Sequence, residues 1–477
     1  MRRPLLILLL FLIVISAGAH SGKAKYHLII DTDGAPDDLR AICLFLSSGE
    51  YEILAITCSD GAIKGSEAYR KVRSLLDEFG HQGIPVSYSE NAGFKKQDWY
   101  ESSLQTQWGV AGKKYPEPAL GASSLIIDAM QKEKEKVTLV ALGGLTNYAE
   151  ALKSNPELAN GIDRIVWYND KAEPLSGINY EIDRKAAGEV LHAGIPVVIV
   201  GGSIIPFSGD IYTATGRCRS VYAKKIIQTH NASPLREKVA ENHLCVWDDL
   251  LPVYLTHPEY FSVDTIDDHC IFVYCSDEKG YLKEYTNLLD WDSGKEGKVF
   301  SLFPADTSLY RADVRPYVNS IIADRGMEEF RCGVLTNELH GHLGIYAVIG
   351  MKMGLRARQY FKLGIDDIMI LSYAGSVPPV SCMNDGLQVS TGGTLGHGLI
   401  SISDEEMKRP EACFTFKGRT ICLKLKEEYA AQISEDVKKG IAEYGDLTPA
   451  YWQHIRELAL KYWAEWDRME IFEITKQ

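Results

Sequence analysis

The chain has 477 residues, 45% of them hydrophobic and 24% charged, a composition that predicts an ordinary globular protein of two or three domains. Its formal net charge of −13 at pH 7 argues against nucleic acid or an anionic membrane surface as a partner. An uncharged small molecule is not excluded.

The first residues have the pattern of a secretory signal peptide. Two arginines precede an apolar run over residues 5–15, and an Ala-Gly-Ala sequence ends at Ala19. We therefore expect a signal peptide at 1–19 and an exported protein, periplasmic or extracellular, with no membrane contact after cleavage. The run is short for a spanning helix, so an uncleaved anchor is the weaker alternative. Ten scattered cysteines are expected to be mostly buried thiols, and their pairing stays open.

From residue 25 to about 200, strand-like and helix-like patterns alternate. The alternation predicts a doubly wound α/β fold, in which helices cover both faces of a mostly parallel sheet. We place this first domain at residues 25–312. The expected strands lie at 28–30, 54–58, 84–87, 137–142, 164–167 and 196–200, and the expected helices at 66–79, 122–132 and 147–152.

Four carboxylates follow the first strand within eight residues, in the sequence DTDGAPDD over 31–38. Like charges this close repel one another unless a cation neutralises them, and oxygen ligands suit a hard ion such as Ca²⁺ or Mg²⁺. The carboxyl end of a strand is also where ligands bind in open α/β sheets. In the structural alternative, Asp37 and Asp38 cap and charge the next helix, and Asp31 and Asp33 are loop residues.

This stretch resembles the DxDPGxDD signature of the nucleoside hydrolases, a family of calcium-dependent N-ribohydrolases. The four acids keep the family's spacing, whereas the Pro-Gly is altered. The resemblance implies the family's doubly wound fold and its Ca²⁺ site. It further implies that Asp33 is a calcium ligand and the general base, that Asp38 is a second ligand, and that Asp37 binds ribose hydroxyls.

Two later stretches extend the resemblance. GGLTN over 143–147 is similar to the family's GxLTNxA segment, which implies that the carbonyl of Leu142 is a calcium ligand; a plain strand-to-helix turn would also explain the glycines. GINYEIDRKAA, which begins at Gly177, is similar to the family's EFNxxxDxxAA segment. This match places Asn179 on a ribose hydroxyl and Asp183 at a helix cap. Gly177 stands where the family has a glutamate, so that sugar contact is lost.

WDD over 247–249 is similar to the segment that completes the family's calcium site. Asp248 falls on the ligand, and Trp247 stands where many members carry a histidine that protonates the leaving base. An indole cannot act in that way, but it could stack on the base. Alternatively, Asp248 and Asp249 simply precede a helix. Ala62 also replaces a polar contact, so recognition of the base stays open.

A new pattern starts near residue 330, and we place a smaller α+β domain at 313–477. His340 and His342 lead into a long apolar helix, and Cys382 follows in a second polar stretch. Two histidines at a helix start more often cap and pack. Together with the thiol, however, they form a ligand set suited to Zn²⁺ or another transition metal.

Both polar stretches resemble the E-like family of formylmethanofuran dehydrogenase subunits, which implies an α+β domain with a second metal site. Two cysteines of that family's pattern are glycines here, Gly344 and Gly393. The pattern further predicts a hairpin over 410–425 and helical segments from Glu427 to the end of the chain.

These observations predict an exported Ca²⁺-dependent hydrolase that cleaves the N-glycosidic bond of a small riboside, with Trp247 near the base. One alternative is a non-catalytic protein that binds a ribosyl ligand through the same residues and carries a metal-binding C-terminal domain. In another, the C-terminal domain is the active part. A homo-oligomer stays open.

Overall fold

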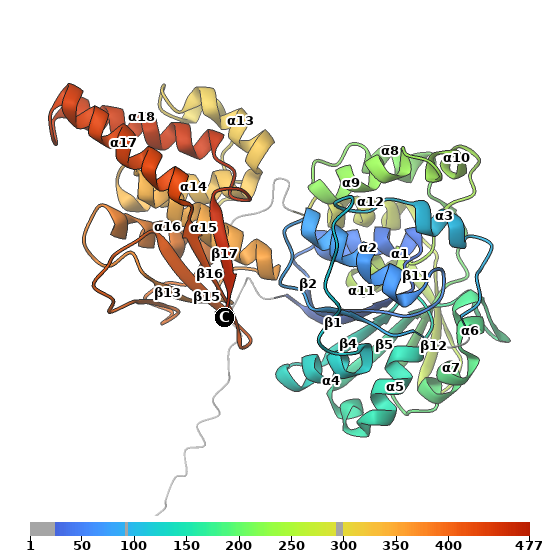
Figure 1. Ribbon diagram of the computed structural model, residues 1–477. Helices are drawn as coiled ribbons and strands as arrows, with labels where there is room; N and C mark the ends of the chain where they lie inside the picture. Colours follow the sequence, from blue (N-terminus) through green and yellow to red (C-terminus); the bar gives the residue numbers. More distant parts are fainter. Residues whose placement is uncertain (1–23, 91–93, 292–298) are drawn as a thin grey trace, which may run out of the picture.

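The computed structural model describes residues 24–90, 94–291 and 299–477, so the expected signal peptide lies outside the described residues. The first domain is centred on an eight-stranded sheet in the order β11-β12-β8-β5-β4-β1-β2-β3 (Figure 1). Neighbouring strands are parallel except β11 and β12. The strands are β1 (Tyr26–Thr32), β2 (Tyr51–Cys58), β3 (Val86–Tyr88), β4 (Val137–Ala141), β5 (Ile162–Tyr168), β8 (Val197–Val200), β11 (Phe261–Thr265) and β12 (Cys270–Cys275).

Helices pack on both faces of this sheet, which confirms the predicted doubly wound fold. Side chains alternate along β1, so that Leu28 and Ile30 enter one hydrophobic core and Ile29 enters the other. The helices of the first face include α1 (Pro36–Ser47), α2 (Gly65–Glu78), α9 (Val221–His230), α11 (Leu250–Thr256) and α12 (Glu278–Leu289). Those of the second include α4 (Ala122–Lys132), α5 (Thr146–Ser154) and α7 (Arg184–Leu191).

The C-terminal domain has its own hydrophobic core, which begins at Val314. Its five-stranded sheet has the order β14-β13-β15-β16-β17 and packs against helices (Figure 1). The strands are β13 (Met369–Ser372), β14 (Ile400–Ile402), β15 (Glu411–Phe416), β16 (Arg419–Leu425) and β17 (Phe472–Lys476); the helices are α13 (Arg315–Arg325), α14 (Met327–His340), α15 (Ile345–Phe361), α16 (Met383–Thr391), α17 (Glu427–Tyr444) and α18 (Pro449–Glu465).

Two local predictions in this domain were wrong. His340 ends α14 instead of opening the long helix, because Gly341 takes a left-handed conformation (φ 81°) and closes α14 before α15 begins. The chain does not finish in helices: β17 pairs antiparallel with β16 and completes the sheet. The predicted hairpin over 410–425 is present, and Cys413 and Cys422 form a disulfide across it.

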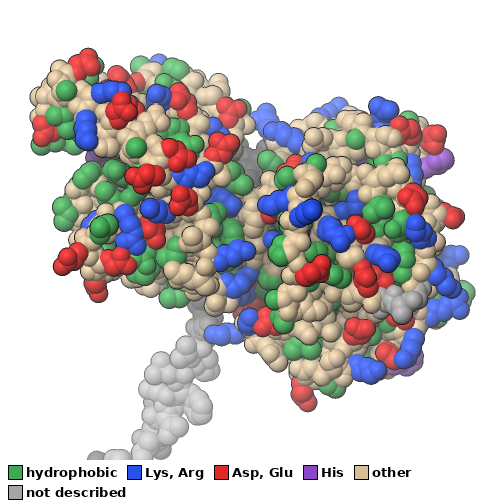
Figure 2. All heavy atoms as spheres, viewed as in Figure 1, with side chains coloured by type: hydrophobic (Ala, Val, Ile, Leu, Met, Phe, Trp, Pro, Cys, Tyr) green, Lys and Arg blue, Asp and Glu red, His purple; other side chains and the backbone are tan. Residues whose placement is uncertain are grey.

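None of the described helices is both long enough and apolar enough to cross a membrane. On the face shown in Figure 2, acidic and basic side chains are interspersed over both domains.

The C-terminal domain docks against the amino-terminal edge of the large sheet. Lys362, which follows α15, donates hydrogen bonds to the carbonyls of Ser48 (2.7 Å) and Tyr51 (2.5 Å) at the start of β2. Arg356 on α15 donates to the carbonyl of Gly80 at 3.0 Å. The acids that follow β1 lie at the opposite, carboxyl-terminal edge, so the second domain does not cover them.

An ion cluster at the same edge joins the two domains. His27, Glu52 and Glu133 bring their polar atoms within 4.8 Å of one another, which would suit a cation. The ammonium group of Lys417, from the β15–β16 turn, contacts both carboxylates. A side chain of the second domain therefore supplies the positive charge that this cluster needs.

The imidazole of His81 offers a test of this docking. Its Nδ1 lies 2.7 Å from the carbonyl oxygen of Gln359, and burial lowers its pKa to about 3. The unfolded chain takes up this proton near pH 6.5, so the free energy of unfolding should fall as the pH drops below that value. Between pH 6 and 5, His81→Gln should lose about 1 kcal/mol less stability than the wild type in urea unfolding.

The matched control is His192→Gln, since His192 is exposed. This variant should follow the wild-type pH dependence. Identical slopes for the His81→Gln variant and the wild type would contradict a neutral, buried His81.

Candidate active site

Asp31 is a structural acid within β1. Its carboxylate is wholly buried and accepts hydrogen bonds from Thr57 Oγ1 (2.5 Å), Ser59 Oγ (2.8 Å) and Asn147 Nδ2 (2.6 Å). Burial raises its pKa to about 7, although these three donors favour the charged form. Asp31 thus ties β1 to the loop after β2 and to α5, and it fixes the position of the turn that follows.

Asp38 closes that turn. Its Oδ2 accepts hydrogen bonds from Thr32 Oγ1 (2.6 Å), from the amide of Asp33 (2.9 Å) and from the amide of Gly34 (3.2 Å). Gly34 has φ 82°, and a Cβ there would lie 2.8 Å from the side chain of Ala68, so only glycine suits the turn. Asp38 thus stands in the first turn of α1, as the structural alternative expected, but α1 has no side-chain cap; the structural role of Asp38 is to close the turn before the helix.

Asp248 comes from a distant part of the first domain's sequence and lies close to the acids that follow β1. It lies just before α11, and its carboxylate oxygen, with those of Asp37 and Asp38, forms a group within 4.8 Å. Asp33 is not part of this close group but adjoins it, since its amide donates to Asp38 Oδ2 at 2.9 Å; on its other side the loop after β2 packs on its carboxylate, and a Cβ added at Gly61 would lie 2.3 Å from Asp33 Oδ2. The fold therefore brings Asp33, Asp37, Asp38 and Asp248 together.

Among the described residues, none of these four acids forms an ion pair with a lysine or arginine, although the charge of Arg40 offsets part of the rise in the pKa of Asp37. Burial, followed by repulsion from Asp38 and Asp37, holds the pKa values of both Asp33 and Asp248 well above the usual range. Asp248 Oδ1 is buried and has no hydrogen-bond partner among the described residues. An orphaned oxygen in an all-carboxylate group is what a hard divalent cation would satisfy, so the residues fit Ca²⁺.

Leu142 follows β4, and Asn179 lies in the short helix α6 (Ile178–Ile182). Asn179 Nδ2 donates to the carbonyl of Leu142 at 2.8 Å and to the carbonyl of Tyr168 at 3.0 Å. Among the described residues its Oδ1 receives no hydrogen bond, so this oxygen is left to accept one from a ligand. Asp183 caps α7 through the amide of Ala186 (2.9 Å), in agreement with the structural role expected for it.

A buried ion pair holds the two halves of the acid group in place. Arg40 Nε lies 2.8 and 2.9 Å from the two carboxylate oxygens of Asp249, and Arg40 Nη2 donates to the carbonyl of Cys245 at 2.7 Å. Both side chains are completely buried. Since Arg40 follows Asp38 on α1 and Asp249 follows Asp248, this pair sets the approach of the two acids.

Residues 28–314 match the family model described as inosine-uridine preferring nucleoside hydrolase, over more than half of the chain. The chain belongs to the nucleoside hydrolase family. It is therefore a member of an enzyme family, as the acid motif predicted. Residues 339–473 match a second model, described as FmdE, molybdenum formylmethanofuran dehydrogenase operon.

Curated relatives of this nucleoside hydrolase include two proteins named pyrimidine-specific ribonucleoside hydrolase RihA. The protein from Klebsiella pneumoniae subsp. pneumoniae is 29% identical over 251 residues, which are 49% of this chain and 81% of that protein. The protein from Citrobacter koseri is 32% identical over 251 residues, 49% of this chain and 80% of that protein. A solved inosine-uridine preferring nucleoside hydrolase from Bacillus anthracis is 20% identical and covers 56% of this chain and 99% of its own, with a TM-score of 0.47.

The positions expected to depart from the family pattern are Trp247, Ala62 and Gly177. Trp247 is half-buried beside Asp248, and Ala62 is 2% exposed and carries no polar group. Gly177 has φ 144°, a backbone conformation that favours glycine. A glutamate at this position would be strained.

The predicted second metal site is only partly assembled. His340 Nδ1 lies 2.7 Å from Asp385 Oδ2, and the rings of His340 and His342 are 4.3 Å apart. His340 Nε2 is buried without a partner among the described residues. Cys382 is half-buried, and burial together with Asp385 raises the pKa of its thiol. Among the described residues, His340, His342 and Cys382 do not form a close ligand group.

Sequence reasoning missed two pairs, Arg40 with Asp249 and Tyr168 with Asp170. A signal existed for the first, because Arg40 stands among apolar residues of α1 and a cation there needs a buried partner. The second had no signal, since the contact of Tyr168 with Asp170 depends on how the chain turns after β5.

Removing one partner of the buried Arg40–Asp249 pair should lower the stability of the fold. Arg40→Met leaves Asp249 as an unpaired buried carboxylate and should lower the free energy of unfolding by about 3–5 kcal/mol, measured by urea unfolding. The double variant Arg40→Met/Asp249→Leu removes both charges and should regain most of this loss. If the single variant were as stable as the wild type, the pair would not hold the site together.

Proposed function

We propose that the chain is an exported, Ca²⁺-dependent hydrolase that cleaves the N-glycosidic bond of a ribonucleoside or a related riboside. The observation that carries the proposal is the buried acid group with the orphaned oxygen of Asp248. Asp33, Asp38, Asp248 and the carbonyl of Leu142 would hold the ion. When bound, Ca²⁺ supplies neutralising charge and polarises the attacking water.

The protein's own residues would then position the sugar and move the proton. Asp37 and Asn179 bind the 2′- and 3′-hydroxyls and fix the ribose for attack. Asp33 removes a proton from water as the oxygen bonds to C1′. The bond from C1′ to the base breaks, the base leaves with the bonding electrons, and the sugar passes through an oxocarbenium-like state.

Trp247 would contact the departing base by stacking. The indole N–H is a donor but not an acid near neutral pH, so Trp247 cannot protonate the base. An aromatic face beside Asp248 supports binding of a planar ring instead. The names of the curated relatives support pyrimidine ribonucleosides as the first substrates to try.

Two features support export. The basic and apolar pattern over 1–19 is that of a signal peptide. The disulfide between Cys413 and Cys422 is typical of proteins in an oxidising compartment.

We also propose that the C-terminal domain binds Zn²⁺ or another transition metal. The contact between His340 Nδ1 and Asp385 would keep Nε2 as the lone-pair nitrogen, the arrangement common for metal-bound histidines. His342 and Cys382 would supply further ligands, on binding, from positions close by.

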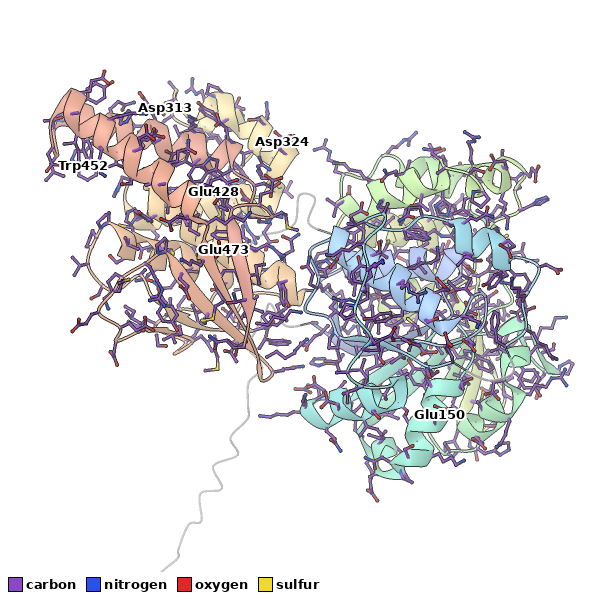
Figure 3. All side chains as sticks on the ribbon, viewed as in Figure 1. Glu150, Asp313, Asp324, Glu428, Trp452 and Glu473 are labelled. Carbon is purple, nitrogen blue, oxygen red and sulfur yellow. A yellow bond between two sulfur atoms is a disulfide. The ribbon has the colours of Figure 1, made fainter. Side chains whose placement is uncertain are left out.

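Ribose release tests the proposed hydrolysis. The mature protein should release ribose from at least one of uridine, cytidine, inosine and adenosine, and a calcium chelator should abolish the release. Asp33→Asn removes both a ligand and the base, so its turnover should fall at least about 10²–10⁴-fold. The matched control is Glu150→Gln, on the exposed side of α5 (Figure 3), which should keep wild-type activity.

Three results would overturn the proposal in different ways. Release that persists with chelator would remove calcium from the mechanism. Full activity of Asp33→Asn would remove the assigned base. Calcium-dependent binding of ribosides without any ribose release would favour the non-catalytic binding protein, which the altered residues Gly177 and Trp247 also suit.

Metal analysis tests the second site. Purified wild-type protein should contain zinc or another transition metal by mass spectrometry, and His340→Ala or Cys382→Ser should abolish it. Asp385→Asn should weaken metal affinity about 10–100-fold, because Asp385 orients a ligand without binding the metal. Glu473→Gln, exposed on β17 (Figure 3), is the control. Retention of the metal in the His340 and Cys382 variants would contradict the proposed ligands.

A further inference from the structure

The chain that follows β5 makes a short hairpin whose ends meet beside the sugar site. Strands β6 (Lys171–Ala172) and β7 (Leu175–Ser176) pair antiparallel, and they return the chain to Gly177. A Cβ at Gly177 would lie 2.7 Å from Asp170 Oδ2 and 2.6 Å from Asn169 Oδ1. The space beside residue 177 is therefore filled by the carboxylate of Asp170.

The hairpin is held by the side chain of Asn169, which is almost fully buried. Asn169 Nδ2 donates to the carbonyls of Lys171 (2.8 Å) and Ser176 (3.0 Å), and its Oδ1 accepts from the amide of Tyr180 at 3.1 Å. All three contacts lie inside the turn. Because its support is complete, the hairpin presents Asp170 in a fixed position.

Asp170 keeps the capacity to accept a hydrogen bond from a ligand. Its Oδ2 accepts from the amide of Ile178 at 3.1 Å, and its Oδ1 accepts from the Tyr168 hydroxyl at the long distance of 3.3 Å. Both side chains are partly exposed. A carboxylate has about four acceptor positions, so these two contacts leave some of them available.

Tyr168 connects Asp170 to the acid group. Its carbonyl accepts a hydrogen bond from Asn179, the residue assigned to a ribose hydroxyl. Burial raises the pKa of its phenol, and the charges of Asp170, Asp248 and Asp37 raise it further. Tyr168 therefore contacts Asp170 through its hydroxyl and Asn179 through its carbonyl.

We propose that Asp170 and Tyr168 form a hydroxyl-binding pair that recognises the 5′-hydroxyl of the substrate ribose. The inference rests on the proposed function, in which Asp37 and Asn179 already take the 2′- and 3′-hydroxyls. The 5′-hydroxyl is the remaining hydroxyl of the ribose, and the carboxylate of Asp170 accepts a hydrogen bond from it. The same negative charge repels a 5′-phosphate, so the site selects nucleosides over nucleotides.

Nucleosides compared with their 5′-deoxy analogues test the roles of Asp170 and Tyr168. We would measure kcat/KM for uridine and inosine, each with its 5′-deoxy analogue, on the full-length mature protein. Because a hydrogen bond to a charged group is at stake, the wild type should prefer the 5′-hydroxylated substrate by about 10- to 100-fold. Asp170→Asn and Tyr168→Phe should reduce this preference strongly and leave cleavage of the 5′-deoxy analogue near the wild-type rate.

The variants are chosen to keep the hairpin. In Asp170→Asn, the side-chain oxygen can still accept the hydrogen bond from the amide of Ile178. In Tyr168→Phe, the aromatic ring is kept. Glu173→Gln is the matched control, since Glu173 is an exposed acid in the same hairpin and should keep the full preference. Asp170→Asn should also cleave a nucleoside 5′-monophosphate better than the wild type does.

The outcomes separate the inference from the function on which it rests. Equal losses on both members of a substrate pair would show that Asp170 and Tyr168 only support the turn, and this would overturn the inference. A wild type that cleaves both members equally well would overturn it too, with the hydrolase intact. A wild type that cleaves no ribonucleoside would overturn the proposed function and the inference together.

Discussion

The repulsion among buried carboxylates at the end of β1 is the constraint on which the site depends. Asp33, Asp37, Asp38 and Asp248 come from the turn after β1, the first turn of α1 and the residues just before α11, and Thr32 and Gly34 hold the carboxylate of Asp38 in that turn. Arg40 neutralises Asp249 rather than these acids, so it stabilises the scaffold without using up the group's charge. An added cation would relieve this repulsion, which is the basis for the proposed Ca²⁺ site.

The two sides of this site are built differently. The residues assigned to the metal and the vicinal hydroxyls follow the family motif; they lie just after β1 and β4, in α1 and α6, and just before α11. On the side assigned to the base and the 5′-hydroxyl, the motif residues are replaced, and a hairpin after β5 supplies Asp170. The shared motif thus lies where strands and helices meet, and a hairpin carries what distinguishes this chain.

The sequence was most informative where a pattern is local. Period-two and helical patterns located β1, α4 and β4 because burial dictates those patterns directly. The spacing of four acids and the match at Asn179 predicted the core of the site. Local patterns could not show that β17 closes the second sheet, because that pairing depends on a distant strand. They also could not show that Asp170 fills the space beside Gly177, because that contact depends on the turn between them.

The C-terminal domain joins the first domain at the edge of the sheet farthest from the acids. There it supplies Lys417 to two glutamates and Lys362 to two carbonyls of the first domain. A chain cut at the boundary would keep every candidate site residue of the first domain, yet Glu52 and Glu133 would lose their contact with Lys417 and keep only the one with His27 of the same cluster. The contact with the second domain is thus part of the first domain's charge balance, and the acids after β1 lie outside that contact. The contact between the two domains thus resembles the interface of a permanent dimer, except that both partners belong to one polypeptide.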